Sequence, residues 1–140
     1  MTEADAVEAI FERWATSWGA LQPSIPFALD NEAFVGVDKF ARVTIVHSTA
    51  QQLSLGPPGS RRFERRGNIT VQLFAPIDQG RKTLSLLVAD VRTTFESQAI
   101  ASPSGGDPLI TFAASTHELA QDDRWYGLAV AIAFVYYERR

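Results

Sequence analysis

The chain has 140 residues, a formal net charge of −3 and 46% hydrophobic residues, a composition typical of one folded domain and unlike that of a disordered segment. It contains no cysteine, which excludes disulfide frameworks, thiolate zinc sites and cysteine nucleophiles. Its longest apolar run, Leu128 to Tyr137, is much shorter than the ~20 residues of a membrane-spanning helix. We therefore expect one soluble domain over residues 1–140, made in the cytoplasm, with no membrane partner.

The first predicted element is an amphipathic helix from about Glu3 to Trp18. Its apolar side chains recur every three or four residues and so share one face of a helix. Thr2 and Asp5 have the spacing of a capping box, and Gly19 is expected to end the helix. The apolar face consists of Val7, Ile10, Phe11, Trp14 and Trp18.

Two strands are predicted next, over residues 39–48 and 67–76, where apolar and polar side chains alternate. We expect them to pair antiparallel and to be joined by a long mobile loop at about 51–66. The segment before them, residues 21–38, contains two prolines and is expected to be extended, with at most a short strand from Ile25 to Ala28.

A second amphipathic helix is predicted from about Arg81 to Glu96, with Asp78 as its N-terminal cap. Both helical stripes are interpreted as core, because the spacing places each of them on a single face. The stripe of this second helix consists of Leu84, Leu87, Val88, Val91 and Phe95.

The last two predicted strands run from Leu109 to Glu118 and from Trp125 to Tyr137. The final strand alternates large apolar side chains with small residues, and neither set is charged, so both of its faces should be covered. The two helices can cover only one face. A neighbouring subunit is the expected cover of the small-residue face; the alternative is that the proline-containing segment folds over it. The small residues are Gly127, Ala129, Ala131 and Ala133.

Together these elements predict an α+β fold in α-β-β-α-β-β order. We expect a four-stranded, mainly antiparallel sheet with two helices packed on one face. Because the second face of such a sheet needs a cover, the pattern favours an oligomer.

No residue pattern for catalysis or metal binding is apparent. His47 and His117 each stand alone in a strand pattern, without a carboxylate or second histidine at metal-ligand spacing. The Gly-Pro-Pro-Gly segment at 56–59 lacks the spacing of a phosphate-binding loop, and no G-x-S-x-G motif is present. We therefore expect no enzyme activity, no catalytic or metal-binding residue and no cofactor.

Positive charge is concentrated between residues 61 and 66. Four arginines and one glutamate give +3 in this stretch, so the remainder of the chain carries −6, which is −3 minus +3. General nucleic-acid binding needs a broadly basic surface, which this chain lacks. A docking arm for another protein is the favoured interpretation, and a nucleic-acid contact and a solvated hairpin tip are the alternatives. The residues singled out are Arg61, Arg62, Phe63, Arg65 and Arg66.

The order of several segments resembles the phage tail terminator-like family of long-tailed phages and prophages, over nearly the whole chain. These segments are AVEAIFERW, IPFALDNEAF, ARVTIVHS, QLSLGPPGSRRFERRGNITVQLFAPIDQG and DDRWYGLAVAIAFVYYE. The most specific part is the Leu-Gly-x-x-Gly-x-Arg-Arg loop at 55–62. The resemblance implies a structural protein of the virion tail whose subunits form a homohexameric ring. Such a ring would stop polymerisation of the tail tube and provide the head-tail joining surface.

The resemblance also implies partners and a place of assembly. The partners would be the tail tube protein and a head-tail connector or neck protein, with DNA passing through the lumen, and assembly would take place in the bacterial cytoplasm. A strongly basic lumen would bind DNA tightly and hinder its passage through the ring. We therefore favour docking over lumen contact for the arginines. Two other functions stay open: a small nucleic-acid-binding module that uses Arg61–Arg66 with Phe63 for stacking, and an oligomeric scaffold of another assembly.

Overall fold

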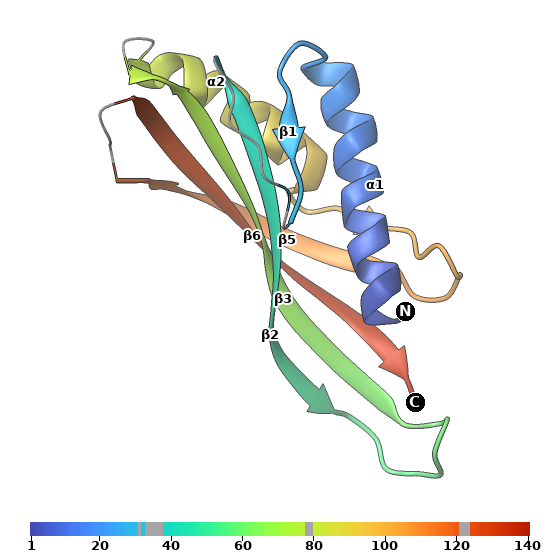
Figure 1. Cartoon of the computed structure of the whole chain (residues 1–140). Helices are drawn as coiled ribbons and strands as arrows, with labels where there is room; N and C mark the ends of the chain where they lie inside the picture. Colours follow the sequence, from blue (N-terminus) through green and yellow to red (C-terminus); the bar gives the residue numbers. More distant parts are fainter. Residues whose placement is uncertain (31, 33–37, 78–79, 121–123) are drawn as a thin grey trace.

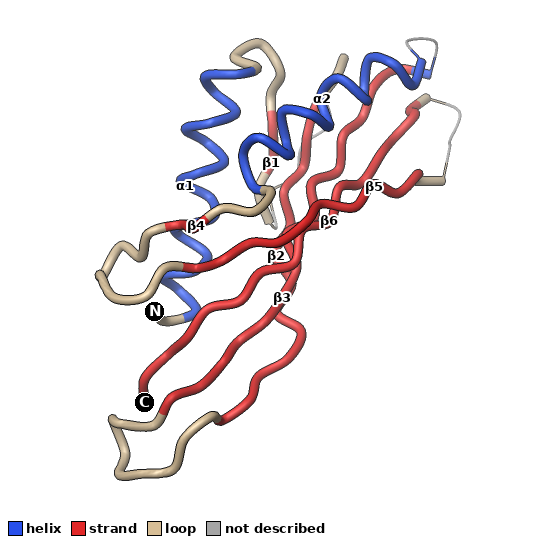
Figure 2. The backbone as a smooth tube through the Cα atoms, turned by 180° about the vertical axis from the view of Figure 1, so that it is seen from behind, coloured by secondary structure: helices blue, strands red, loops and turns tan. Residues whose placement is uncertain are grey.

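The computed structural model describes residues 1–30, 32, 38–77, 80–120 and 124–140 (Figure 1). Its helices are α1 (Glu3–Leu21) and α2 (Gly80–Phe95), and its strands are β1 (Phe27–Ala28), β2 (Phe40–Gln52), β3 (Arg62–Pro76), β4 (Ala99–Ile100), β5 (Leu109–Glu118) and β6 (Trp125–Arg139). The strands form one sheet in the order β1-β2-β3-β6-β5-β4. Figures 1 and 2 show this sheet curled, with both helices on the same side of it.

The chain is α+β, as predicted, but the prediction of a four-stranded, mainly antiparallel sheet is wrong. The sheet has six strands and is mixed, because β1 pairs parallel to β2 while the other pairs are antiparallel. The two additional strands, β1 and β4, contain two residues each. β1 lies within Ile25–Ala28, where a short strand at most was expected, but it was not counted in the predicted sheet. β4 was not expected, because alternation of apolar and polar residues cannot be recognised over two residues.

The predicted antiparallel pairing of β2 with β3 is confirmed, and both strands are longer than expected. Their ladder runs from Phe40↔Phe74 to Gln52↔Phe63, with one irregularity between His47 and Thr49. The two ends of the loop predicted at 51–66 are therefore strand, and residues 53–61 connect β2 to β3. Side chains on both faces of a projecting hairpin meet solvent, so the apolar alternation that marks a strand is lost there. The mobility of the connecting loop stays a prediction.

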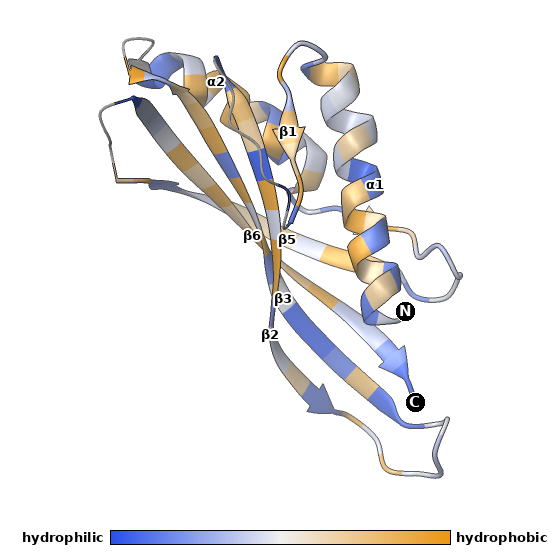
Figure 3. Cartoon of the chain, viewed as in Figure 1, coloured by the Kyte–Doolittle hydropathy of each residue, from blue (hydrophilic) through white to orange (hydrophobic). Residues whose placement is uncertain are grey.

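β2 and β3 project beyond the helices as an arm, defined here as residues 48–66, with residues 53–61 as its tip (Figure 1). β6 accompanies this arm, because it pairs with β3 from Pro76↔Trp125 to Arg62↔Arg139. In Figure 3 the arm end of β3 is coloured hydrophilic, whereas the strands beside the helices carry more hydrophobic residues. The arm is thus a polar continuation of the core sheet.

The start of α1 agrees with the prediction and its end does not. Thr2 Oγ1 accepts a hydrogen bond from the Asp5 N–H at 3.1 Å, and the Asp5 carboxylate accepts one from the Thr2 N–H at 2.9 Å, which completes the capping box. The prediction that Gly19 ends the helix is wrong, since α1 continues to Leu21. Burial of Trp18 in the last turns stabilises the helix by more than one exposed glycine costs. Asp78, the predicted cap of α2, lies outside the described residues.

The core lies between the two helices and one face of the sheet. The rings of Trp14 and Trp18 in α1 stack with centroids 4.6 Å apart, and Phe95 of α2 stacks on Trp14 at 6.0 Å. All five apolar positions predicted for α2 are buried. The large alternate side chains of β6 from Leu128 to Tyr136 are buried against the helices as well. Where it lies beside the helices, this face of the sheet is therefore buried inside the subunit.

Candidate assembly surfaces

The sheet face opposite the helices, called the outer face here, is covered by neither helix (Figure 2). Its central side chains are short, uncharged and exposed or half-buried. A face of this kind allows the backbone of another protein to approach closely, so it is suited to protein contact. Cross-strand register sets one row of Val46, Asn68 and Ala133 beside a second row of Thr44, Thr70, Ala131 and Ser115.

The four small residues predicted to form a subunit interface do not share one environment. Gly127 and Ala129 are buried within the subunit itself. Ala131 is half-buried and Ala133 is exposed. Only these last two positions are open to a neighbour, and their contact with one stays a prediction.

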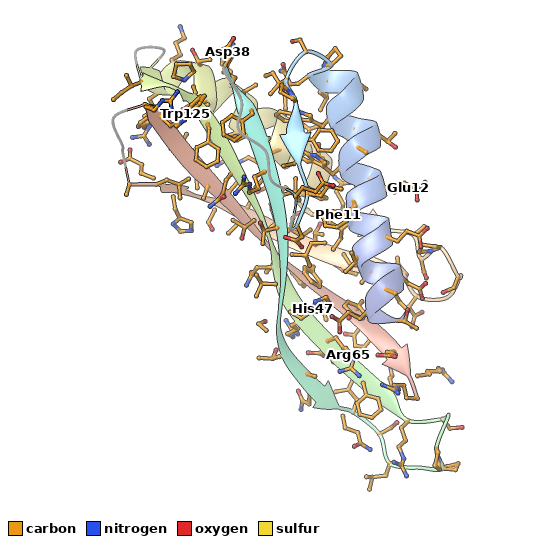
Figure 4. All side chains as sticks on the ribbon, viewed as in Figure 1. Phe11, Glu12, Asp38, His47, Arg65 and Trp125 are labelled. Atoms are coloured by element: carbon orange, nitrogen blue, oxygen red, sulfur yellow. The ribbon has the colours of Figure 1, made fainter. Side chains whose placement is uncertain are left out.

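An aromatic cluster closes the Gly127 end of the outer face, where Figure 4 labels Trp125. Phe40 stacks on Phe74 at 4.8 Å, and Trp125 meets Phe40 edge-on at 5.1 Å. A Cβ atom added to Gly127 would lie 2.9 Å from Leu119 Cδ1 and 3.2 Å from the Phe74 ring. The rings come from three different strands, so the sequence alone does not bring them together.

The structure places most of the basic cluster on a strand, with Arg62–Arg66 inside β3 and Arg61 directly before it. Arg65 Nε lies 2.8 Å from Glu138 Oε2, and Arg66 Nε lies 2.5 Å from Glu64 Oε1 (Figure 4 labels Arg65). Both carboxylates are mostly shielded, with side-chain exposures of 12% for Glu138 and 16% for Glu64. Two of the four arginine charges are therefore compensated at short range.

The other two arginines have weaker contacts. The guanidinium carbon of Arg62 lies 4.2 Å from the centroid of the Tyr137 ring, and its Nη2 lies 3.9 Å from Asp107 Oδ2. Arg61 Nε donates to the Gly56 carbonyl at 2.7 Å, and within the described part of the chain Arg61 has no acidic partner. Sequence reasoning missed the partners on and near β6, because only the pairing of β3 with β6 brings them to the arm.

The tip presents apolar side chains to solvent. Leu55 is 92% exposed and Leu53 is 43% exposed. The Arg62 N–H donates to Ser54 Oγ at 2.9 Å, and Gly59 adopts a φ of +93°, a conformation that glycine tolerates best. The two leucines are thus displayed by a hydrogen-bonded turn.

The two histidines have separate, local partners. His47 Nε2 lies 2.9 Å from Tyr136 Oη, and its Nδ1 lies 3.6 Å from Glu3 Oε1, so His47 links the first turn of α1 to the sheet (Figure 4). Burial raises the pKa of Tyr136 to about 12, and the Glu3 charge contributes in the same direction. His117 is exposed beside Ser115 Oγ at 3.2 Å. The described residues contain no group of three His, Asp or Glu side chains able to hold a metal ion.

A groove of about 390 Å³ runs between α1 and β4. Ala9 and Ile100, which are 4% and 5% exposed, form an apolar floor. Arg13 lines the groove too, but it donates to the Thr94 carbonyl at 2.6 Å and to Gln98 Oε1 at 2.8 Å. Glu12, on the side of α1 away from β2 and β3 in Figure 4, has no basic partner in the ranges that the structure describes.

Comparison with known proteins identifies a family. A family model described as phage tail terminator protein matches residues 4–134. A solved structure that carries no functional name is similar, with a TM-score of 0.76 at 18% identity over 100% of this chain and 99% of that chain. A chain from the virion of a native gene transfer agent particle is also similar, with a TM-score of 0.53 at 11% identity over 96% of this chain and 98% of that chain. These two likenesses show a shared fold. The comparison with curated proteins gave no match.

Proposed function

The chain belongs to the phage tail terminator family, and on that premise we propose that it forms a hexameric ring which stops tail tube polymerisation and provides the head-tail joining surface. As a member of the family it is a structural component of the phage tail, and no helix in the described ranges is long and apolar enough to cross a membrane. The proposed partners are the tail tube protein and a head-tail connector or neck protein, with DNA passing through the lumen. Assembly takes place in the bacterial cytoplasm, and the role is structural rather than enzymatic.

The observation that carries the ring is the outer face of the sheet. A ring needs heterologous contacts, in which one patch of a subunit meets a different patch of the next and the rotation closes. Ala131 and Ala133 on the outer face supply an uncharged patch that neither helix covers. The arm supplies a second, projecting surface at another part of the subunit (Figure 1). The outer face and the arm are thus two separate surfaces, and each can meet a different patch of a neighbouring subunit, as heterologous contacts require.

The charge pairing in the arm favours docking over nucleic-acid binding. Phosphate contacts require arginines whose charge is free, and each such contact adds salt-dependent affinity. Arg65 and Arg66 are already paired with Glu138 and Glu64 at hydrogen-bond distance. The arm therefore offers fewer free charges than its sequence indicates, which supports the docking interpretation of Arg61–Arg66.

A tube-capping experiment tests the proposed function. Purified protein added to polymerising tail tube subunits should fix tube length and appear as a ring at one tube end in electron micrographs. Ala131→Arg places a bulky charge on the outer face and should leave overlong tubes. Ala89→Arg is the matched control, because Ala89 is exposed on α2. Unchanged tube lengths with the wild-type protein would contradict the proposal.

A further inference from the structure

The leucine at the end of the arm is exposed, and none of the described residues of its own subunit covers it. Leu55 is 92% exposed, while hydrogen bonds from the Arg62 N–H to Ser54 Oγ and from Arg61 Nε to the Gly56 carbonyl hold the turn that displays it. A turn that is already held loses little conformational freedom on binding, so an apolar side chain on it is an efficient anchor. Single exposed leucines are common, but this one stands at the far end of a projecting element.

The tip cannot reach the helical side of its own subunit. Figures 1 and 2 place residues 53–61 beyond the C-terminal end of β6, away from both helices. Continuous pairing of β3 with β6, and pairing of β2 with β3 on both sides of the irregularity between His47 and Thr49, hold the arm in that direction. Because no part of the subunit that the structure describes reaches Leu55, we look for its cover on another molecule.

The α1–β4 groove is complementary to the tip in both polarity and charge. Its floor of Ala9 and Ile100 is apolar, which suits a leucine side chain. Glu12 at its rim has no basic partner, and Arg61 at the tip has no acidic partner, within the described part of the chain. Opposite charges placed beside an apolar contact fix the orientation of two proteins and favour their encounter.

We propose that the tip of the arm of one subunit seats in the α1–β4 groove of the next, with Leu55 over the apolar floor and Arg61 beside Glu12. The occupant is a second copy of this chain. The contact is heterologous, because the tip and the groove are different surfaces, and repeating it by a fixed rotation closes a ring. This inference rests on the proposed function, since it specifies one of the contacts between ring subunits.

Cysteine cross-linking tests the contact directly, because the natural chain contains no cysteine. Pro57→Cys at the tip keeps Leu55 in place, and Ala101→Cys puts the second thiol at the groove, where Ala101 is exposed. Oxidation of the double variant with diamide should give a ladder of covalent oligomers on a non-reducing gel. The control pair, Pro57→Cys with Ala89→Cys, should give no ladder beyond dimers. Equal ladders from both pairs, or no ladder from the first, would overturn the inference.

A charge exchange gives a second, independent measurement. Glu12→Arg alone should weaken self-association measured by sedimentation velocity, and adding Arg61→Glu should restore part of it. Leu55→Ser should weaken association by roughly 10- to 100-fold, the loss expected for one buried leucine, whereas Leu86→Ser, which removes another exposed leucine on α2, should not.

The outcomes separate this contact from the proposed function. Tube capping by the wild-type protein, together with unchanged association of Leu55→Ser and Glu12→Arg, would refute the tip-to-groove contact and leave the terminator role standing. A wild-type protein that assembles through the tip but does not cap tubes would refute the terminator role instead. A wild-type protein that stays monomeric in sedimentation velocity, together with no ladder from the Pro57→Cys and Ala101→Cys double variant, overturns the contact.

Discussion

Gly67, at the base of the arm, gives the sharpest stability prediction. It pairs with His47 on one side and with Phe134 on the other. A Cβ atom at this position would lie 2.6 Å from Phe134 Cζ and even closer to the carbonyl oxygen of Val46. The carbonyl belongs to the backbone of a paired strand and cannot rotate away. Gly67→Ala should therefore cost the upper part of the range for overpacking, about 3 kcal/mol.

A smaller opposing term reduces this cost. Alanine restricts the unfolded chain more than glycine does, which stabilises the folded state by about 0.4–1 kcal/mol. The net loss should be about 2 kcal/mol, equivalent to a fall in Tm of roughly 6 °C for a domain of this size. Urea and thermal unfolding followed by circular dichroism measure it.

Two other glycines provide the controls. Gly19 lies in α1, and a Cβ atom added there would have nothing within 4 Å. Because glycine destabilises a helix relative to alanine, Gly19→Ala should raise the free energy of unfolding by about 0.5–1 kcal/mol. Gly127→Ala would meet Leu119 Cδ1, the mobile end of a side chain, and should cost about 1 kcal/mol. If Gly67→Ala unfolded at or above the wild-type temperature while Gly19→Ala behaved as expected, the close packing at the arm base would be refuted.

Three further variants test other parts of the structure. Arg65→Ser removes an ion pair whose arginine is only 23% exposed and should cost about 1 kcal/mol in urea unfolding. Arg66 is 51% exposed, so solvent screens its pair with Glu64 and Arg66→Ser should cost near zero; equal effects would contradict this difference between the two arginines. The pKa of Tyr136 is raised by burial to about 12, so the neutral phenol contributes stability that is present below pH 10 and lost as pH rises toward 12. Tyr136→Phe should reduce that alkaline loss in unfolding experiments and remove the last step of a tyrosine absorbance titration; an unchanged titration would refute the assignment. Ala131→Arg should keep the circular dichroism spectrum of the wild type but lower its oligomer mass by light scattering, and an unchanged mass in a folded variant would refute a neighbour at this position.

The elements with long periodic patterns could be predicted from the sequence. The stripe from Leu84 to Phe95 repeats over three turns, and all of its members are buried. β5 was predicted with its observed bounds, Leu109–Glu118, because turn residues flank it on both sides. Local spacing was sufficient in these cases, since each element buries the face that its own residues mark.

The remaining features depend on contacts between distant residues. The two-residue strands β1 and β4 pair with the edges of β2 and β5. The sequence allowed at most a short strand at the position of β1, and no local pattern predicts β4 or the pairing of either strand. From the sequence, the arginines of the basic cluster had no visible acidic partner beyond Glu64, because Glu138 is remote in the chain. Only the pairing of β3 with β6 places Glu138 beside Arg65. Likewise, Gly127 looked available to a neighbour, but an aromatic ring from β3 occupies that space.

The uninterrupted pairing of β3 with β6 also has a mechanical consequence. Both strands pass from the helical core into the arm without a break, from Pro76↔Trp125 to Arg62↔Arg139. Hydrogen bonds in an antiparallel pair lie perpendicular to the strands. A force applied to the tip along the strand axis therefore shears many hydrogen bonds at once, and does not peel them open one after another. The arm can therefore transmit tension to the core without coming apart, so a partner bound at the tip is mechanically coupled to the whole subunit.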